Sequence, residues 1–415
     1  MDRRAFLAFL VTSPVFATSF DDFLANETAG FEEFKSSLLE EFEEYVRVIN
    51  EEFSNYKKSL SNAWLEPEIS SSHKWVQYSK DFFTRSIVDF EKNTLKIESV
   101  GGFSGDKEAQ IKQHLNRILQ QDTKSAVEND MLIGHIEARL AGLPHVIKGD
   151  IPKSDSILGL AFSEDKVEAD SESVIALQSE IVDANGKPVY RSFPGEQQIT
   201  ASSGDSLFAT AKKGKDERQA NGKTSDHVVI KLSSKFLKRR AEKQEPVVLD
   251  KSSKYRVNFS ALMALMHTES SFNPMALSES AYGLLMINPE TSGRVAHKKI
   301  YGNEKIISPT YLYNNVNNIE LGSAYFNLLY HKYLKGVENP VSRLYCAIVS
   351  YNAGLGNVAR TFSGRPVLRK AIGKINEKDP DAVFKTFQDR LPFEESKIYL
   401  TKVKERLSYY IQASD

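Results

Sequence analysis

Apolar residues recur at regular spacings along the first part of the chain. Between residues 31 and 60 they return every three or four positions, which predicts a long helix with one apolar face. Apolar and polar residues then alternate over residues 86–98. This period of two predicts a β-hairpin that turns near Lys92 and Asn93. Residues 107–142 are again predicted to be helical, with Gly142 and Pro144 as the stop signals.

Strand patterns separated by polar sequence follow. Residues 172–183 and 225–232 are predicted to be strands. The sequence between them, residues 184–224, is rich in Gly, Lys, Ser and Asp, and Asn185-Gly186 predicts a turn. We therefore expect residues 20–235 to form an α+β accessory domain with long loops.

Helical patterns dominate the rest of the chain. Residues 236–415 are expected to form one mostly α-helical domain, of a size that a single hydrophobic core can serve. The predicted fold class is thus α+β, with a smaller accessory domain before a helical one. The helices are predicted over residues 235–243, 258–269, 290–298, 317–334, 340–350, 355–362, 366–373, 380–388 and 393–411.

The composition is that of a globular protein of two or three domains. The chain has 415 residues, 41% of them hydrophobic, and a formal net charge of -1, so no nucleic-acid partner is expected. An acidic run at 21–68 and a basic run at 212–243 are interpreted as a solvated helix face and a solvated linker. The single cysteine, Cys346, rules out an intramolecular disulfide. The eight histidines lack metal-binding spacing, so neither a metal nor a cofactor is expected.

The N-terminus is typical of an exported protein. Arg3 and Arg4 precede a short apolar stretch at 5–11, and Ala17 offers a small residue for cleavage. We predict a signal peptide over residues 1–19 and a location in the periplasm. The twin arginines fit a second export route. A frayed, buried helix is the other interpretation of this segment. No cysteine follows the segment, so a lipid anchor at that point is not expected, while peripheral membrane association stays open.

An apolar helix is predicted to end on a carboxylate. Leu262, Leu265 and Met266 lie on or beside the helix face of Glu269. Partial removal of a carboxyl group from water raises its pKa and keeps it protonated near neutral pH. A general acid needs that state. The alternative is an ordinary solvated glutamate at a helix end.

Four short motifs accompany this helix in a fixed order. They are Glu-Ser-Ser-Phe-Asn-Pro at 269–274, Gly-Leu at 283–284, Tyr-Asn-Ala-Gly at 351–354, and Glu-Ser-x-x-Tyr at 395–399. Together they resemble the lysozyme-like catalytic domain of the soluble lytic transglycosylases. A tryptophan-containing segment at 75–78 and the segment 84–90 resemble the accessory domain of the type C, membrane-bound members.

The resemblance implies a cell-wall enzyme with one catalytic residue. Glu269 matches the family's lone glutamate, which protonates the bond between N-acetylmuramic acid and N-acetylglucosamine in peptidoglycan. It then accepts a proton from the muramic 6-hydroxyl, which closes a 1,6-anhydro ring. An internal nucleophile makes the second carboxylate of ordinary glycosidases unnecessary, and its effective concentration exceeds that of water. The expected partner is therefore the glycan strand of peptidoglycan; the oligomeric state stays open.

The resemblance also implies a set of substrate-binding positions. Met286 stands where the family usually has a glutamine, and a thioether cannot replace the hydrogen bonds of an amide. Asn288, where the family has a methionine, supplies an amide nearby. The positions implied are Ser270, Met286, Asn288, Tyr351, Asn352, Glu395 and Tyr399.

Two other functions remain open from the residues alone. A muramidase that uses water needs a second carboxylate, for which Glu279 and Glu290 are the nearest candidates in sequence. A peptidoglycan-binding protein without catalysis would account for the loss of the usual glutamine. Internal or terminal cleavage of the glycan and the preference for its peptides are likewise not determined.

Overall fold

The computed structural model describes residues 40–101, 106–161, 192–193, 196–197, 212–218 and 224–412. The predicted signal peptide and the predicted strand at 172–183 lie outside these residues. No helix in the described part of the chain combines the length and the apolar character needed to cross a membrane.

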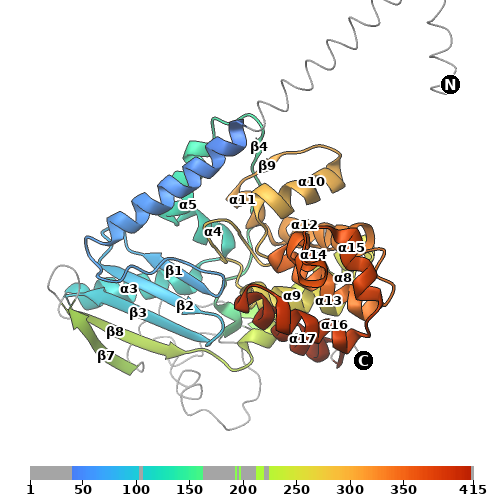
Figure 1. Cartoon of the computed structure of the whole chain (residues 1–415). Coiled ribbons are helices and arrows are strands. Elements are labelled where there is room, and N and C mark those ends of the chain that lie inside the picture. Colours follow the sequence, from blue (N-terminus) through green and yellow to red (C-terminus); the bar gives the residue numbers. More distant parts are fainter. Residues whose placement is uncertain are drawn as a thin grey trace, which may run out of the picture.

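A twisted antiparallel sheet forms the centre of the N-terminal half (Figure 1). A helix over residues 40–60 precedes it, as the apolar periodicity predicts. The predicted hairpin is confirmed, and Asn93 takes a φ of 50° in its turn, a conformation that asparagine tolerates well. The strand order is β1 (Lys74–Tyr78), β2 (Thr84–Asp89), β3 (Thr94–Val100), β8 (Thr224–Lys231) and β7 (Lys212–Arg218).

Strand β7 lies inside the segment that the sequence predicts to be loop. Its residues, Lys-Lys-Gly-Lys-Asp-Glu-Arg, are almost all charged and show no apolar alternation. They form a strand because β8 pairs with them along one edge of the sheet, and backbone hydrogen bonds do not depend on an apolar side chain. The remaining short strands and the 3₁₀ helix are β4 (Val146–Ile147), β5 (Ser192–Phe193), β6 (Glu196–Gln197), β9 (Ile306–Ile307) and η1 (Gly159–Ala161).

The helical prediction over residues 107–142 is confirmed, and the chain divides this stretch into three helices. They are α3 (Asp106–Gln120), α4 (Thr123–Glu128) and α5 (Met131–Leu140). Asp122 and Asp130 each accept a hydrogen bond from the backbone of the following turn. An aspartate in that role starts a helix and so interrupts a longer one.

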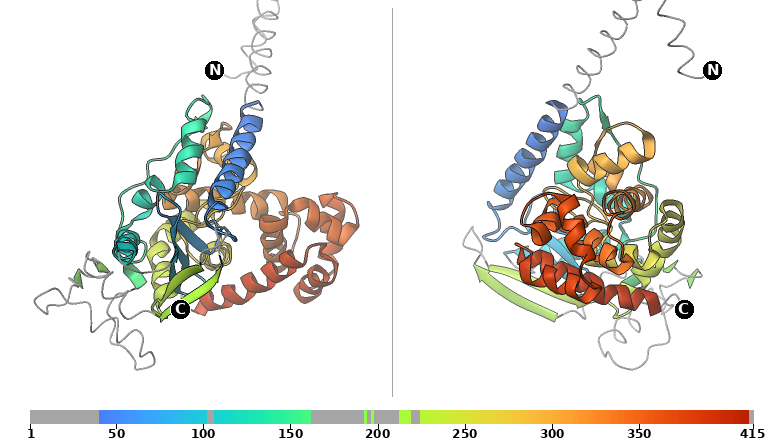
Figure 2. Two further views of the ribbon diagram at one scale, coloured as in Figure 1. Left: turned by 90° about the vertical axis from the view of Figure 1, so that its left-hand side faces the viewer. Right: turned by 45° about the vertical axis from the view of Figure 1, so that its right-hand side comes forward.

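The C-terminal half is helical, as predicted (Figures 1 and 2). The helix predicted to end at residue 243 continues through Pro246, and two predicted helices contain stretches of π-helix. The elements are α8 (Phe236–Tyr255), α9 (Phe259–Ser270), η2 (Pro289–Gly293), α10 (Arg294–Tyr301), α11 (Pro309–Leu312), α12 (Asn315–Asn327), η3 (Leu328–Tyr333), α13 (Pro340–Ala353), α14 (Leu355–Ser363), α15 (Leu368–Asn376), α16 (Pro380–Arg390) and α17 (Glu394–Gln412). The α+β class is confirmed.

The two halves share one hydrophobic core. A single cluster of buried side chains runs from the helix at 40–60 through the sheet and α9 to α17. Strand β4 pairs in parallel with β9 across the boundary, and α9 and α17 lie side by side next to the sheet (Figure 1). The segment 71–73 also bonds directly to the chain that follows α9, so the sheet supports that segment. The division into domains near residue 235 stays a prediction.

Replacing Asp122 with alanine tests the interruption before α4. The Asp122 carboxylate accepts hydrogen bonds from the backbone N–H of Ser125 (2.8 Å) and of Ser154 (3.0 Å). Burial opposes ionisation, but these hydrogen bonds outweigh it and lower the pKa of Asp122. We expect Asp122→Ala to lose about 1–2 kcal/mol of unfolding free energy at pH 7 in urea titrations.

That loss should shrink as the pH falls through the lowered pKa of Asp122, because protonation removes the same stabilisation from the wild type. The control is Asp381→Ala, which removes an exposed aspartate from α16 that caps no helix. Equal losses for the two variants would contradict the role of Asp122.

Candidate active site

Glu269 lies in the last turn of α9, a helix made mostly of buried apolar residues. Its N-terminus is capped by Asn258, whose side-chain oxygen accepts the N–H of Ala261 (2.8 Å). Its C-terminus is closed by Ser271 in the left-handed conformation, with a φ of 51°. Every position from 260 to 266 is buried, so the helix is held on most of its circumference. Glu269, in the last turn, is half-buried.

The surroundings of Glu269 hold its carboxyl group near the midpoint of its titration. Burial raises the pKa of Glu269 from 4.5 to about 7. The Tyr399 hydroxyl donates a hydrogen bond of 2.5 Å to Oε1 and acts in the opposite direction, while the charge of Glu395 raises the pKa further. The group is thus protonated in a large fraction of molecules at neutral pH and ionised in the rest, as an acid that must also act as a base requires.

A tight turn lies beside the C-terminal end of α9, where Ser270 bonds to it. Tyr282 and Ile287 form a one-residue antiparallel bridge across it, and Gly283 adopts a φ of 74°. A Cβ at Gly283 would lie 2.6 Å from the Leu312 carbonyl oxygen and against the amide of Asn318. Only glycine therefore fits this position.

Asn318 forms hydrogen bonds to the backbone of this turn from the protein interior. The sequence does not indicate Asn318 as a site residue. It is fully buried; its Oδ1 accepts the N–H of Leu285 (2.8 Å), and its Nδ2 donates to the carbonyl oxygens of Tyr282 (2.8 Å) and Leu312 (3.0 Å). An asparagine in an amphipathic helix gives no sequence signal of this kind, because its partners are distant backbone groups.

Ser270 and Tyr351 bond to the same turn. The Ser270 hydroxyl is buried and donates to the carbonyl oxygen of Leu284 (2.7 Å). The Tyr351 hydroxyl donates to the carbonyl oxygen of Leu285 (2.8 Å). Both side chains therefore fix the turn relative to α9 and α13, and the role of each as a substrate contact stays a prediction.

Tyr399, rather than Tyr351, contacts the carboxyl group. Burial, and then the negative charge of Glu269, raise the pKa of both Tyr351 and Tyr399 well above the usual range. Both phenols are therefore neutral donors at physiological pH. Tyr399 belongs to α17, so the last long helix of the chain completes the environment of the acid.

The remaining predicted positions border the same region. Met286 and Asn288 are half-buried in and after the turn, and Met286 has a φ of 44°. The Asn288 side-chain oxygen caps η2 by accepting two backbone N–H groups, which leaves its amide nitrogen for other partners. Asn352 and Glu395 are exposed. Asn352 accepts a hydrogen bond from Ser396 (2.8 Å) and so joins α13 to α17.

The two rival carboxylates have other surroundings. Glu279 is exposed and forms an ion pair with Lys57 (2.7 Å). Glu290 is half-buried at the start of η2, where burial raises its pKa. Glu269 accepts a hydrogen bond from Tyr399. Neither Glu279 nor Glu290 takes part in that hydrogen bond. Within the described ranges, the His, Cys, Asp and Glu side chains form no group of three that could hold a metal ion.

His267 belongs to the packing between α9 and α17. Its Nδ1 lies 3.2 Å from the Tyr410 hydroxyl, and its ring lies against Phe272. Burial, followed by the charge of Arg406, lowers the pKa of His267 to about 3. It is therefore neutral at physiological pH.

Comparison with known proteins defines the class of this helical half. The model of the Transglycosylase SLT domain family matches residues 246–371, which include α9, the turn and Tyr351. Membrane-bound lytic murein transglycosylase C of Salmonella arizonae is 31% identical over 337 residues, which cover 81% of each chain. The same enzyme of Yersinia enterocolitica is 30% identical over 340 residues, again 81% of each chain. The chain belongs to the membrane-bound lytic murein transglycosylase C family.

Two further similarities have a lower sequence identity. The membrane-bound lytic murein transglycosylase C of Histophilus somni is 29% identical to this chain. The matched region covers 81% of this chain and 80% of the relative's chain. A solved structure of an inactive mutant of the lytic transglycosylase Slt from Pseudomonas aeruginosa aligns with 40% of this chain and 24% of that chain, at 23% identity. Its TM-score of 0.32 is too low to bear on the fold.

Replacing Tyr399 with phenylalanine tests how the carboxyl group is tuned. The Tyr399 hydroxyl stabilises the ionised form of Glu269 and so lowers its pKa. We expect Tyr399→Phe to raise the pKa of Glu269 by about one unit, since a hydrogen bond to a charged group contributes roughly 1.5–3 kcal/mol, part of which solvent replaces. Titration of ¹³C-labelled glutamate carboxyl groups by NMR measures the change, with Glu269→Gln to assign the signal.

The matched control is Tyr351→Phe, which removes a phenol bonded to a backbone carbonyl oxygen instead. It should leave the titration of Glu269 nearly unchanged. An unchanged or lower pKa in Tyr399→Phe would contradict the tuning of Glu269 by this phenol.

Proposed function

We propose that this protein cleaves the glycan strands of peptidoglycan as a lytic transglycosylase, with Glu269 as its only catalytic acid and base. The observation that carries the proposal is the half-buried carboxyl group at the end of α9, with a pKa near 7 and a neutral tyrosine bonded to it. The curated relatives are named lytic murein transglycosylases, and this chain spans four fifths of their length.

The first step is proton donation. Protonated Glu269 transfers its proton to the oxygen that links C1 of N-acetylmuramic acid to N-acetylglucosamine. The C1–O bond breaks, and positive charge develops at C1, where the substrate's own acetamido group stabilises it. Glu269 leaves this step ionised, and the hydrogen bond from Tyr399 stabilises the new carboxylate.

The second step returns the proton. The carboxylate of Glu269 accepts the proton of the muramic 6-hydroxyl, and that oxygen forms a bond to C1. The product is a 1,6-anhydro sugar, no water is consumed, and Glu269 is protonated again. Because the nucleophile is part of the substrate, the site needs no second carboxylate.

Other residues hold the substrate or the turn. We assign Ser270 and Tyr351 to positioning of the turn, from which Met286 extends. Met286, Asn288, Asn352 and Glu395 are assigned to contacts with the sugars or their peptides, with the free amide groups as the hydrogen-bonding members. Residues 20–235 are proposed to form the accessory domain and residues 236–415 the catalytic domain.

We also propose where the protein works. Residues 1–19 have the pattern of an export signal, and peptidoglycan lies outside the inner membrane. The relatives are named membrane-bound, which supports a place at the cell envelope. The finer proposal is the periplasm, with peripheral contact to a membrane.

Mass spectrometry of digested peptidoglycan tests the reaction and the catalytic residue together. Wild-type protein is expected to release muropeptides lighter by one water than hydrolytic products, and Glu269→Gln is expected to release none. Glu279→Gln is the matched control, because this exposed carboxylate is paired with Lys57 and should retain activity. Products of full hydrolytic mass would indicate a muramidase, and binding to peptidoglycan without cleavage by the wild type would indicate a binding protein.

Replacing Met286 with glutamine tests the departure from the family pattern. The residue has a φ of 44°, which glutamine adopts at no greater cost than methionine. The added amide supplies hydrogen bonds to the sugar, so we expect kcat/KM on peptidoglycan to rise by about tenfold, equivalent to roughly 1.4 kcal/mol. Met286→Leu, which adds no amide, should not raise it. A gain in both variants would assign the effect to packing instead.

A further inference from the structure

The backbone takes an unusual course directly after the catalytic glutamate. Ser271 and Phe272 both adopt a positive φ, of 51° and 58° respectively. Residues other than glycine are disfavoured in this left-handed region, so two successive residues of this kind store strain beside Glu269. Such strain persists only where the surrounding contacts hold the backbone in place. The contacts of this segment therefore also bear on where the last turn of α9 lies.

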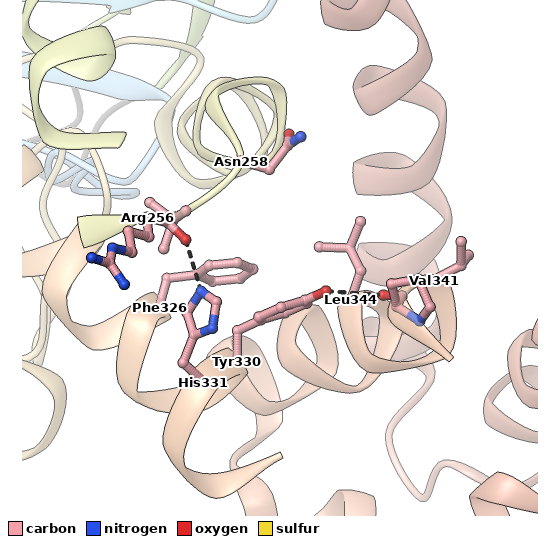
Figure 3. Close-up of a pocket in the computed structure, with 9 residues that line it drawn as sticks. Arg256, Asn258, Phe326, Tyr330, His331, Val341 and Leu344 are labelled. Carbon is pink, nitrogen blue, oxygen red and sulfur yellow. Dashed lines mark hydrogen bonds between the residues drawn. The ribbon is translucent and has the colours of Figure 1, made fainter. Parts of the chain in front are cut away.

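Packing at the other end of α9 does not supply this restraint by itself. Asn258, at the start of α9, lines a pocket of about 350 Å³ together with Phe326 and Leu344 (Figure 3). The pocket leaves space beside the start of the helix, so the packing there restrains the helix less than a filled core would. Glu269 lies in the last turn of the same helix, and its position depends on the contacts at that end.

The segment 71–73 of the N-terminal half contacts the strained backbone through two neighbouring residues. The Nδ1 atom of His73 lies 3.1 Å from the hydroxyl oxygen of Ser271. The carbonyl oxygen of Ser72 accepts a hydrogen bond from the amide nitrogen of Asn273 (3.1 Å), a side chain that is fully buried. The strained segment is thus held on its side-chain groups by residues that precede it by almost two hundred positions.

The segment 71–73 is itself fixed to the sheet. It leads directly into β1, and the carbonyl oxygen of His73 accepts the N–H of Phe90 (2.9 Å), the residue that follows β2. The backbone of His73 therefore belongs to the paired strands and not to a free loop. A side chain on such a support can hold its partner in one place more firmly than a side chain on a loop can.

His73 also lies close to α17, the helix that carries Tyr399. Burial lowers the pKa of His73, and the charges of Arg406 and Lys402 on α17 act in the same direction, against that of Glu91. The imidazole is therefore neutral at physiological pH. Glu91, just after β2, lies 3.7 Å from the Lys402 ammonium. His73 is thus placed where the hairpin, the end of α9 and α17 meet, next to both supports of the Glu269–Tyr399 pair.

We propose that His73 is a positioning residue for the catalytic glutamate. Through the hydroxyl of Ser271 it holds the strained backbone after Glu269, and it thereby keeps the carboxyl group against the phenol of Tyr399. A histidine of the N-terminal half then takes part in catalysis without contact to any reacting atom. The proposal rests on the proposed function only for the chemical role of Glu269, because the geometry that it concerns can be measured without substrate.

NMR titration of Glu269 in paired variants tests this role without substrate. Tyr399→Phe is expected to raise the pKa of Glu269 by about one unit in the wild-type background. In a His73→Ala background the same substitution should raise it by less than about half a unit, because the carboxyl group no longer lies against the phenol. His135→Ala is the matched control background, since this histidine of α5 has a side chain that is 70% exposed, and the full shift should remain there.

A shift of full size in the His73→Ala background would overturn the proposal. So would the absence of a shift in the wild-type background, since the phenol would then not hold the carboxyl group at all. Ser271→Ala removes the other partner of the contact and should reduce the shift as much as His73→Ala does, with no further reduction when the two are combined. If circular dichroism shows that His73→Ala does not fold, the Ser271→Ala background gives the decision instead.

Rates on soluble peptidoglycan fragments separate positioning from general stability. We expect His73→Ala to lower kcat by roughly tenfold while KM changes by less than about twofold, because a misplaced catalytic group affects the transition state more than substrate binding. His73→Asn, whose amide puts a polar atom near the position of Nδ1, should recover most of the rate. Equal losses in the two variants would contradict the role of this contact. If the wild type releases no anhydro products, the proposed function fails, whereas the titration still decides the role of His73.

Discussion

A carboxyl group kept partly out of water needs partners from several parts of the chain. Glu269 is at the end of an apolar helix, and burial raises the pKa of its carboxyl group. The hydroxyl of Tyr399 offsets part of this effect by favouring the ionised form. The balance gives a pKa near 7, so the same group can donate a proton and accept one without a large free-energy cost in either state. Much of the surrounding structure serves to keep these two side chains together.

The support for that pair comes from both halves of the protein. Tyr399 belongs to α17, and α17 packs along α9 through Tyr410 and His267. The segment at 71–73 contributes hydrogen bonds from before the sheet to Ser271 and Asn273, directly after α9. A shared hydrophobic core then joins the sheet to the helices. The N-terminal half is thus bonded directly to the chain that follows α9.

The turn at 282–287 is fixed by side chains that come from distant parts of the chain. Asn318 satisfies three backbone groups of the turn and its neighbour, and Ser270 and Tyr351 bond to two of its carbonyl oxygens. Gly283 fits because no side chain can occupy its place. With the backbone held so firmly, the chemistry at Met286 can differ from that of the family without a change in the shape of the turn.

The sequence by itself determined the local features. Apolar residues spaced by three and four predict α9 and most of the C-terminal helices, and alternating apolar residues predict the hairpin of β2 and β3. These elements can be predicted because each buries one face, and the buried face is set by residues close together in the sequence. The four motifs indicated the family and Glu269.

Tertiary structure decided what depends on distant partners. Pairing with β8 makes a strand of the charged segment β7. Side-chain caps divide the helical stretch predicted over residues 107–142 into three helices. The packing of α17 brings Tyr399, 130 residues along the chain, to the carboxyl group. Asn318 became a site residue only through backbone groups that folding placed around it. These contacts join positions far apart in the chain, and no local pattern of residues specifies which distant group will meet which.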